Sequence, residues 1–173
     1  MMRASIPGES DGESGKILSL RASDLLVLER VQVPLRAASK HEVLTELVDV
    51  LVDSLGLAAA RDEVVRAVLE RESVLSTGIG GGVALPHAKH NRLDGLAMAA
   101  GSSREPIEFE ALDGRPVRLF FLLLGPDSAA GAHVRALSRV SRIVQDASLR
   151  GRLVAATDGE HFLRILGEAE RAA

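Results

Sequence analysis

The run of apolar residues Leu119–Leu124 constrains the fold more than any other feature of this chain. It is far shorter than the roughly 20 residues that a membrane-spanning helix needs. A short apolar run ended by a proline, here Pro126, is typical of a strand that is buried on both faces. We therefore expect a strand over Val117–Leu124 in the centre of a sheet.

Several shorter strand signals accompany this run. The turn signal Asp113-Gly114 stands between two apolar segments, which predicts a hairpin and therefore an antiparallel pair of strands. The glycine-rich stretch Ser76–Gly82 is predicted to be a loop. The remaining candidate strands are Val31–Val33, Val83–Leu85, Leu96–Gly101 and Ile107–Phe109.

Helical periodicity precedes and follows these strand signals. Two pairs, Ser39 with Glu42 and Thr157 with Glu160, have the spacing of capping boxes that open helices. The predicted helices are one or two turns around Ser23-Asp24, Ser39–Leu55, Arg61–Glu70, Ala130–Gln145, Leu149–Ala156 and Thr157–Leu166. Helices on both sides of a block of strands indicate an α/β protein with a mixed, parallel and antiparallel, central sheet flanked by helices.

The length of 173 residues predicts a single domain. Residues 1–16 are rich in Gly, Ser and Glu, which predicts a flexible N-terminal tail before a domain over residues 17–170. The start of the chain has no apolar run, so we expect no signal peptide and no direct membrane insertion.

Composition excludes several classes of function. The chain has no cysteine, which rules out disulfides, thiolate metal sites and a cysteine nucleophile, and is compatible with a cytoplasmic protein. The net charge of −3 and the absence of Trp and Tyr argue against a nucleic acid partner. Aromatic residues make up 2%, which also argues against a direct sugar-binding pocket.

The most informative segment begins at Arg71 and ends at His87. Arg71 offers a permanent, bidentate partner for phosphate oxygens. The glycines of Gly78–Gly82 allow backbone N–H groups to converge on an anion, and Thr77 adds a hydroxyl donor. His87 follows a short strand, and neutral imidazole is a competent nucleophile for phosphoryl transfer near pH 7. From the residues alone, a glycine turn beside a structural histidine explains the segment equally well, because it matches no Walker or dinucleotide motif.

Other polar residues have simpler interpretations. His90, Asp94 and His133 could be proposed as zinc ligands, but a solvent-exposed His90 is favoured over a metal ligand, and no metal is expected. His41 and His161 are expected to be structural or surface residues. Asp113 is interpreted as a turn residue rather than a general base.

The chain resembles the mannitol/fructose-type enzyme IIA domains of the bacterial phosphoenolpyruvate-dependent phosphotransferase system, and especially the nitrogen-regulatory branch. The resemblance runs from about Ser23 to Leu166. The matching blocks are Ser39–Leu44, Arg71-Glu72 with Ser76–Gly80, Ala84–His87, Pro106–Phe109 with Asp113–Val117, the strand to Pro126, and His133 with Leu137-Ser138.

This resemblance implies a site and a reaction. His87 would accept a phosphoryl group at Nε2 from the carrier protein HPr, and His133 would be a second active-site histidine. Arg71 and a phosphoryl-binding loop would hold the phosphoryl oxygens, with no metal and no cofactor. The loop residues so implied are Thr77, Gly78, Gly80 and Gly81.

Three alternative functions stay open. A regulatory phosphocarrier would bind target proteins according to its phosphorylation state, since a phosphohistidine adds about two negative charges. A sugar-transport component would pass the group to a separate IIB protein. A protein-binding regulator that is not phosphorylated at all is the third possibility.

Overall fold

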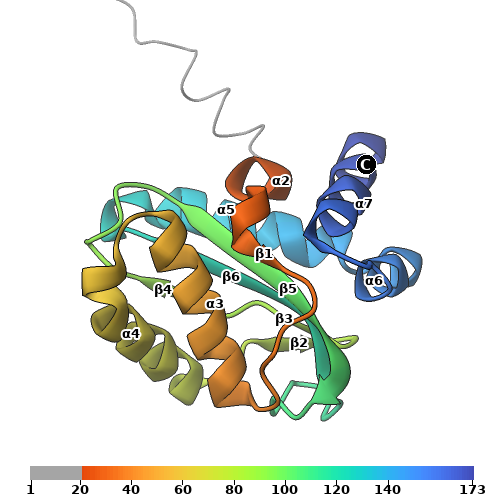
Figure 1. Ribbon diagram of the computed structural model, residues 1–173, viewed down its shortest axis with the longest axis horizontal. Coiled ribbons are helices and arrows are strands. Elements are labelled where there is room, and N and C mark those ends of the chain that lie inside the picture. Colours follow the sequence, from red (N-terminus) through yellow and green to blue (C-terminus); the bar gives the residue numbers. More distant parts are fainter. Residues whose placement is uncertain (1–20) are drawn as a thin grey trace, which may run out of the picture.

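The computed structural model describes residues 21–173, which form one sheet with helices on both faces (Figure 1). The predicted tail, residues 1–16, lies outside the described residues. The strands are β1 Val31–Gln32, β2 Gly78–Gly80, β3 Val83–Ala84, β4 His87–Lys89, β5 Ala97–Ile107 and β6 Val117–Gly125. The order is β1-β5-β6-β3-β2, and β4 also pairs with β6.

Strand β6 is the centre of the sheet, as its apolar sequence predicts. It runs antiparallel to β5 and parallel to both β3 and β4, while β1 is parallel to β5. The predicted mixed sheet is therefore confirmed.

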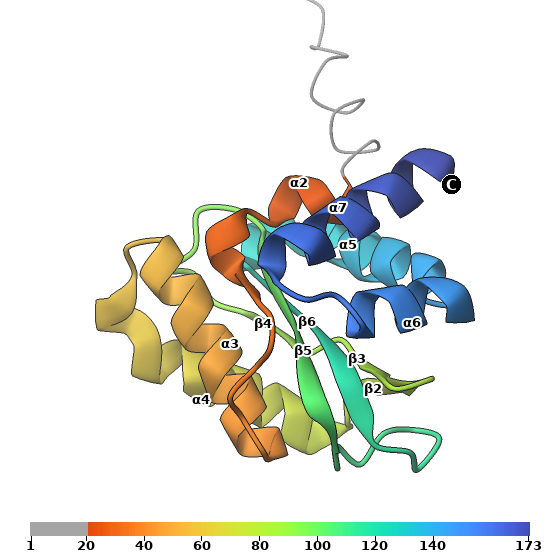
Figure 2. The same ribbon diagram turned by 45° about the vertical axis from the view of Figure 1, so that its right-hand side comes forward.

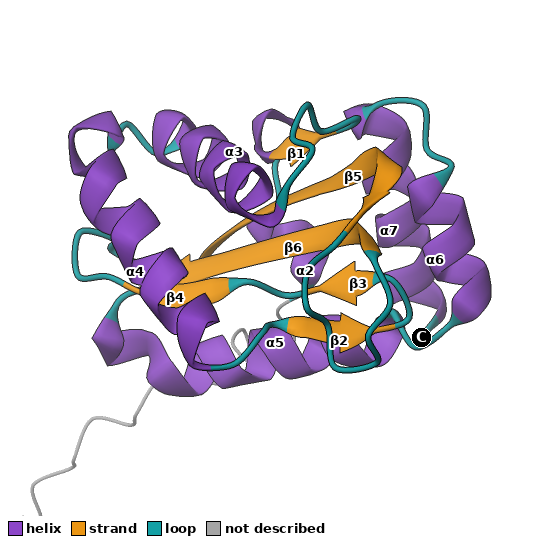
Figure 3. Ribbon diagram, turned by 90° about the horizontal axis from the view of Figure 1, so that it is seen from below, coloured by secondary structure: helices purple, strands orange, loops and turns teal. Residues whose placement is uncertain are grey.

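Helices cover the two faces unequally. The helices are α2 Ala22–Leu25, α3 Lys40–Ser54, α4 Arg61–Val74, α5 Ala130–Ile143, α6 Ala147–Val154 and α7 Gly159–Ala172. Figures 2 and 3 show α3 and α4 on one side of the sheet and α5, α6 and α7 on the other. This is the predicted flanking arrangement, in a single domain.

The side chains of β6 divide between two cores. Phe120, Leu122 and Leu124 pack with the residues of α3 and α4, whereas Phe121 and Leu123 pack with those of α5, α6 and α7. Because both faces are covered, a strand in this position has no place for polar residues. Burying each such side chain contributes about 1.5–3 kcal/mol.

The boundaries of two elements differ from the sequence prediction. Strand β5 joins most of the candidate strand Leu96–Gly101 to Ile107, the first residue of the candidate Ile107–Phe109, and its pairing with β6 shifts register between Ser102 and Ile107; Phe109 lies outside the strand. The exposed polar residues at this irregularity gave the appearance of a break. Helix α4 continues to Val74, four residues beyond the predicted end at Glu70.

Two local predictions are corrected by hydrogen bonds. The N-cap of the last helix is Asp158, whose carboxylate accepts from the His161 backbone N–H, so the capping box at Thr157 is wrong. Ser39 does cap α3 by accepting from the Glu42 N–H, but the Glu42 carboxylate accepts from Ala38 rather than from Ser39.

Candidate active site

His87 is the first residue of β4, where it pairs with Leu123 of the central strand. The sequence placed His87 at the end of a strand, but Pro86 has no N–H to donate and separates β3 from β4. The His87 side chain is half-buried. Its position is therefore set by the central strand on one side and by the Leu85–Pro86 segment before it.

A backbone carbonyl selects one tautomer of the His87 ring. Nδ1 lies 2.8 Å from the Leu85 carbonyl oxygen, which can only accept, so Nδ1 carries the proton. Nε2 then has a free lone pair, and no residue of the described range 21–173 forms a hydrogen bond with it. Nε2 is therefore the ring atom that is free to act as a nucleophile or as a hydrogen-bond acceptor.

The electrostatic surroundings keep His87 neutral. Burial lowers the pKa of His87, and the hydrogen bond to Leu85 opposes that effect. The positive charges of Arg71 and Lys89 lower the pKa further, and the negative charge of Glu72 raises it. A pKa below the usual 6.5 leaves the imidazole almost wholly neutral, and hence nucleophilic, at pH 7.

His133 lies in the first turn of α5 with its ring against that of His87. The two ring centroids are 5.6 Å apart and the ring planes meet at 64°. His133 is only 3% exposed, and neither ring nitrogen has a hydrogen-bond partner among the described residues. Burial lowers the pKa of His133 to about 4, with smaller contributions from His87 and Lys89. A buried polar group without a partner is rare enough to require an explanation.

Arg71 occupies the last turn of α4 rather than a loop. Its Nη1 donates a 2.9 Å hydrogen bond to the Leu75 carbonyl oxygen. The positive charge of the guanidinium is one of the causes that lower the pKa of His87, after burial of that ring. Four of the five guanidinium N–H groups remain for other acceptors. The predicted pairing of Arg71 with the His87 region is consistent with this placement.

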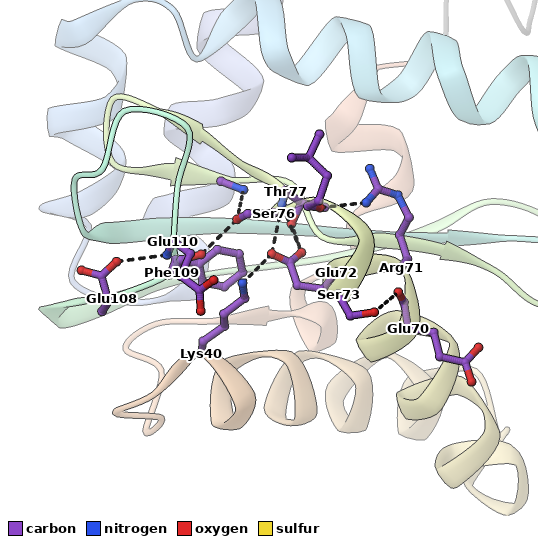
Figure 4. Close-up of polar contacts among 12 residues, drawn as sticks. Lys40, Glu70, Arg71, Glu72, Ser73, Ser76, Thr77, Glu108, Phe109 and Glu110 are labelled. Carbon is purple, nitrogen blue, oxygen red and sulfur yellow. Dashed lines mark hydrogen bonds and ion pairs between the residues drawn. The ribbon is translucent and has the colours of Figure 1, made fainter.

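Glu72, which the sequence analysis did not single out, follows Arg71 in the same helical turn, and its side chain points in a different direction (Figure 4). Its carboxylate is buried, forms a 2.9 Å ion pair with Lys40, and accepts hydrogen bonds from the backbone N–H and the hydroxyl of Thr77. One signal was available: Glu72 stands four residues after the core residue Val68, on the helix face where an apolar residue is expected.

The glycine segment is not where the sequence placed it. Gly78–Gly80 forms strand β2 instead of a loop, and the positive φ angles of Gly80, Gly81 and Gly82 make the turn into β3. Val83, just after this turn, pairs with Leu119, four residues along β6 from Leu123, the partner of His87. The turn therefore lies roughly 13 Å from His87, given about 3.3 Å per strand residue.

The N–H and hydroxyl donors of the glycine segment form hydrogen bonds within the protein instead of facing His87. The Gly81 N–H donates to Asp113, and the Gly78 N–H donates to the Ser76 hydroxyl. The Thr77 hydroxyl donates to Glu72. The structure thus brings Arg71 and His133 to His87, but it does not bring Gly80, Gly81 or the Thr77 hydroxyl there.

The other polar residues have structural roles. His90 is half-buried rather than solvent-exposed: Nε2 lies 3.4 Å from Glu63 and Nδ1 accepts from the Arg92 N–H. Asp113 accepts from the N–H groups of Gly81 and Arg115, which makes it a turn residue as predicted. In residues 21–173, no group of three or more His, Asp or Glu side chains could hold a metal ion.

The family of the chain follows from comparison with known proteins. A family model described as the phosphoenolpyruvate-dependent sugar phosphotransferase system, EIIA 2, matches residues 24–169. The chain belongs to this family. The EIIA 2 domain therefore spans nearly all of the described residues, and the resemblance seen in the sequence motifs is confirmed. In residues 21–173, no helix of this domain is long and apolar enough to cross a membrane.

Relatives of this EIIA 2 domain fall into two groups. The "Nitrogen regulatory protein" of Bradyrhizobium diazoefficiens is 33% identical over 144 residues, which are 83% of this chain and 93% of the relative. The "PTS system fructose-specific EIIA component" of Haloferax volcanii is 32% identical over 84% of this chain and 94% of the relative. The fructose-specific EIIABC component of Bacillus subtilis is 32% identical, but the chain spans only 24% of its length.

Solved structures agree with this assignment. The nitrogen regulatory protein IIA-Ntr from Neisseria meningitidis matches with a TM-score of 0.76 at 31% identity, over 83% of this chain and 97% of that one. The mannitol IIA of Escherichia coli matches with a TM-score of 0.69 at 21% identity, over 82% and 98%, and shows the shared fold.

Proposed function

We propose that this EIIA domain is a phosphocarrier in which His87 Nε2 accepts a phosphoryl group from the phosphohistidine of an HPr-type protein. One observation carries the proposal: the Leu85 carbonyl holds the Nδ1 proton, so that Nε2 is the nucleophile, next to a buried His133 that has no partner. The absence of cysteine fits a cytoplasmic setting for this exchange.

The reaction needs no cofactor. The Nε2 lone pair of His87 attacks phosphorus, the Nε2–P bond forms, and the P–N bond of the donor breaks with its electron pair returning to the donor imidazole. Phosphoryl transfer depends mainly on in-line positioning and on stabilising the charge of the equatorial oxygens. Arg71 supplies a fixed positive charge for those oxygens, and His133 supplies a ring N–H. The start of α5, whose N-cap is Ala129 and has no side-chain oxygen, adds N–H groups that favour an anion.

Exposed apolar residues beside the site suit a protein donor. Val74 and Leu75, which follow Arg71 and Glu72, are 81% and 59% exposed, and Val134, next to His133, is 64% exposed. Exposed apolar side chains grouped around a reactive group are typical of a surface that docks another protein. They support an HPr-type partner over a small phosphate donor.

Two destinations of the phosphoryl group have support among the relatives. The nitrogen regulatory proteins of several bacteria, with 93% of the relative covered in Bradyrhizobium diazoefficiens, favour a regulatory role in which phosphorylation changes the binding of target proteins. The fructose-specific EIIA relative favours transfer to a separate IIB protein. A mannitol IIA has been solved in complex with its phosphorylated IIB, which provides a precedent in that protein for such a transfer.

Phosphorylation by purified enzyme I, HPr and phosphoenolpyruvate tests the proposal. We expect one acid-labile phosphoryl group by intact mass, located at His87 by peptide mapping, and no labelling of His87→Ala. Labelling of His87→Ala at the wild-type rate would disprove the assignment. A wild-type domain that takes no phosphoryl group from an active, matched HPr would favour the non-phosphorylated, protein-binding alternative.

A further inference from the structure

A buried carboxylate lies one residue from the arginine of the site. Glu72 is 6% exposed, and its carboxylate receives three donors: the Lys40 ammonium at 2.9 Å, the Thr77 N–H at 3.0 Å and the Thr77 hydroxyl. Lys40 in turn lies 4.8 Å from the centroid of the Phe109 ring. Figure 4 shows this cluster between α3, the end of α4 and the segment that leads into β2.

Hydrogen bonds continue from this carboxylate to the reactive ring. Glu72 accepts from the Thr77 N–H, and the Thr77 carbonyl accepts from the Leu85 N–H at 2.9 Å. The Leu85 carbonyl then accepts from His87 Nδ1 at 2.8 Å. Thr77 and Leu85 each use their N–H on one side and their C=O on the other, so the bond to Glu72 fixes the position of the backbone that orients the next bond. The series ends at the bond that selects the His87 tautomer.

Stability alone does not explain a carboxylate in this position. Replacing a buried ion pair by apolar residues of similar size is often neutral or stabilising, because the charges must be taken out of water. Val68, one helical turn earlier on the same face, is a buried apolar residue, so this face of α4 otherwise packs into the core. The carboxylate therefore serves to order the Thr77 backbone rather than to fill the core.

We propose that Glu72 is a positioning residue for phosphoryl transfer: through Thr77 and Leu85 it holds the imidazole of His87 in the Nδ1–H tautomer, with Nε2 directed at the phosphoryl donor. This inference rests on the proposed function of His87. Glu72 itself touches neither the donor nor the reacting atoms.

Nitrogen NMR of ¹⁵N-histidine-labelled protein tests the inference, because the ring shifts report which nitrogen carries the proton. We expect a single Nδ1–H tautomer for His87 in the wild type and a mixture of tautomers in Glu72→Leu. Glu72→Gln keeps an oxygen that accepts from Thr77, so it should restore the wild-type tautomer. Glu70→Leu is the matched control, because Glu70 lies on the same helix and its side chain is not buried.

Transfer kinetics give the second readout. The maximal rate of phosphorylation by phospho-HPr should fall roughly ten-fold in Glu72→Leu, since small errors in orientation slow such reactions. The apparent KM for phospho-HPr should stay unchanged, and Glu72→Gln should regain most of the rate. A wild-type tautomer and rate in folded Glu72→Leu would overturn the inference.

Two further outcomes are decisive. If Glu72→Leu does not fold, Glu72→Met replaces it, since methionine has nearly the length and shape of glutamate but no oxygen to accept from Thr77, and an unchanged His87 tautomer would then overturn the inference. If the wild type takes no phosphoryl group but Glu72→Leu still shifts the tautomer, the positioning of His87 stands and the proposed phosphocarrier function fails.

Discussion

The rings of His87 and His133 meet edge to face, with centroids 5.6 Å apart. Both have a lowered pKa, so both are neutral at pH 7 and do not repel each other. His87 has one nitrogen held by Leu85, whereas His133 is buried with neither nitrogen bonded within residues 21–173. A phosphoryl group on His87 would give His133 an acceptor. The pair is therefore better suited to the phosphorylated form than to the free one.

Replacing His133 by Phe should separate stability from activity. A planar ring is kept, although a larger one, and two buried nitrogens without partners are removed, so the free energy of unfolding should rise by about 1 kcal/mol. Phosphorylation of His87 should slow by roughly 100-fold, because a donor to the transferring group is lost. Urea denaturation and phospho-HPr kinetics measure the two effects. His133→Gln, which keeps an N–H donor, should recover part of the rate, and a wild-type rate in both variants would refute the role of His133.

The free energy of unfolding should fall in mild acid because of His133. The pKa of His133 is about 4 in the folded state, and that of an unfolded histidine is about 6.5. Below pH 6.5 the unfolded chain binds a proton that the folded chain does not, so the free energy of unfolding falls as the pH drops towards 4. The full difference is about 3 kcal/mol. His133→Phe should lose less stability than the wild type between pH 7 and pH 5, and parallel pH profiles would contradict the assignment.

Arg71 should contribute to phosphoryl transfer both through its positive charge and through the paired N–H donors of its guanidinium group. In Arg71→Met the pKa of His87 should rise, because the positive charge that lowers it is gone. Arg71→Lys keeps the charge, so the His87 pKa should stay near the wild-type value, yet transfer should slow by about ten-fold without bidentate contacts. NMR titration and transfer kinetics test the two parts. An Arg71→Lys variant with wild-type kinetics would show that charge alone is required.

The glycine turn should tolerate change without loss of activity. Asp113→Ala removes two hydrogen bonds, to Gly81 and Arg115, in an exposed turn, and should lower the free energy of unfolding only slightly. The rate of phosphorylation should stay unchanged because the turn lies roughly 13 Å from His87, at about 3.3 Å per strand residue. A large fall in rate would return Gly80 and Gly81 to the phosphoryl-binding site that the sequence predicted.

Predictions from sequence succeeded where the structure depends on neighbouring residues in the chain. They failed where pairing with another strand determines the structure. The apolar run ending at Leu124 predicts a central strand, because burial on both faces requires apolar residues at every position. The segment Gly78–Gly80 was predicted to be a loop because glycine disfavours strands, yet pairing with β3 makes it β2. The break predicted before Ile107 was wrong for a related reason, since pairing with β6 carries β5 through its polar residues.

The amino-acid sequence by itself determined the α/β class and the central strand, and it singled out His87, Arg71 and His133 as candidate site residues. Apolar periodicity and short motifs carry that information because they depend on neighbouring residues. Only the tertiary structure decided which of these groups meet. It placed His133 against His87, moved Gly80 and Gly81 to the far end of the strand, and linked Glu72 to His87 through Thr77 and Leu85. Strand register and helix packing join residues that are distant in the chain, and no local pattern encodes them.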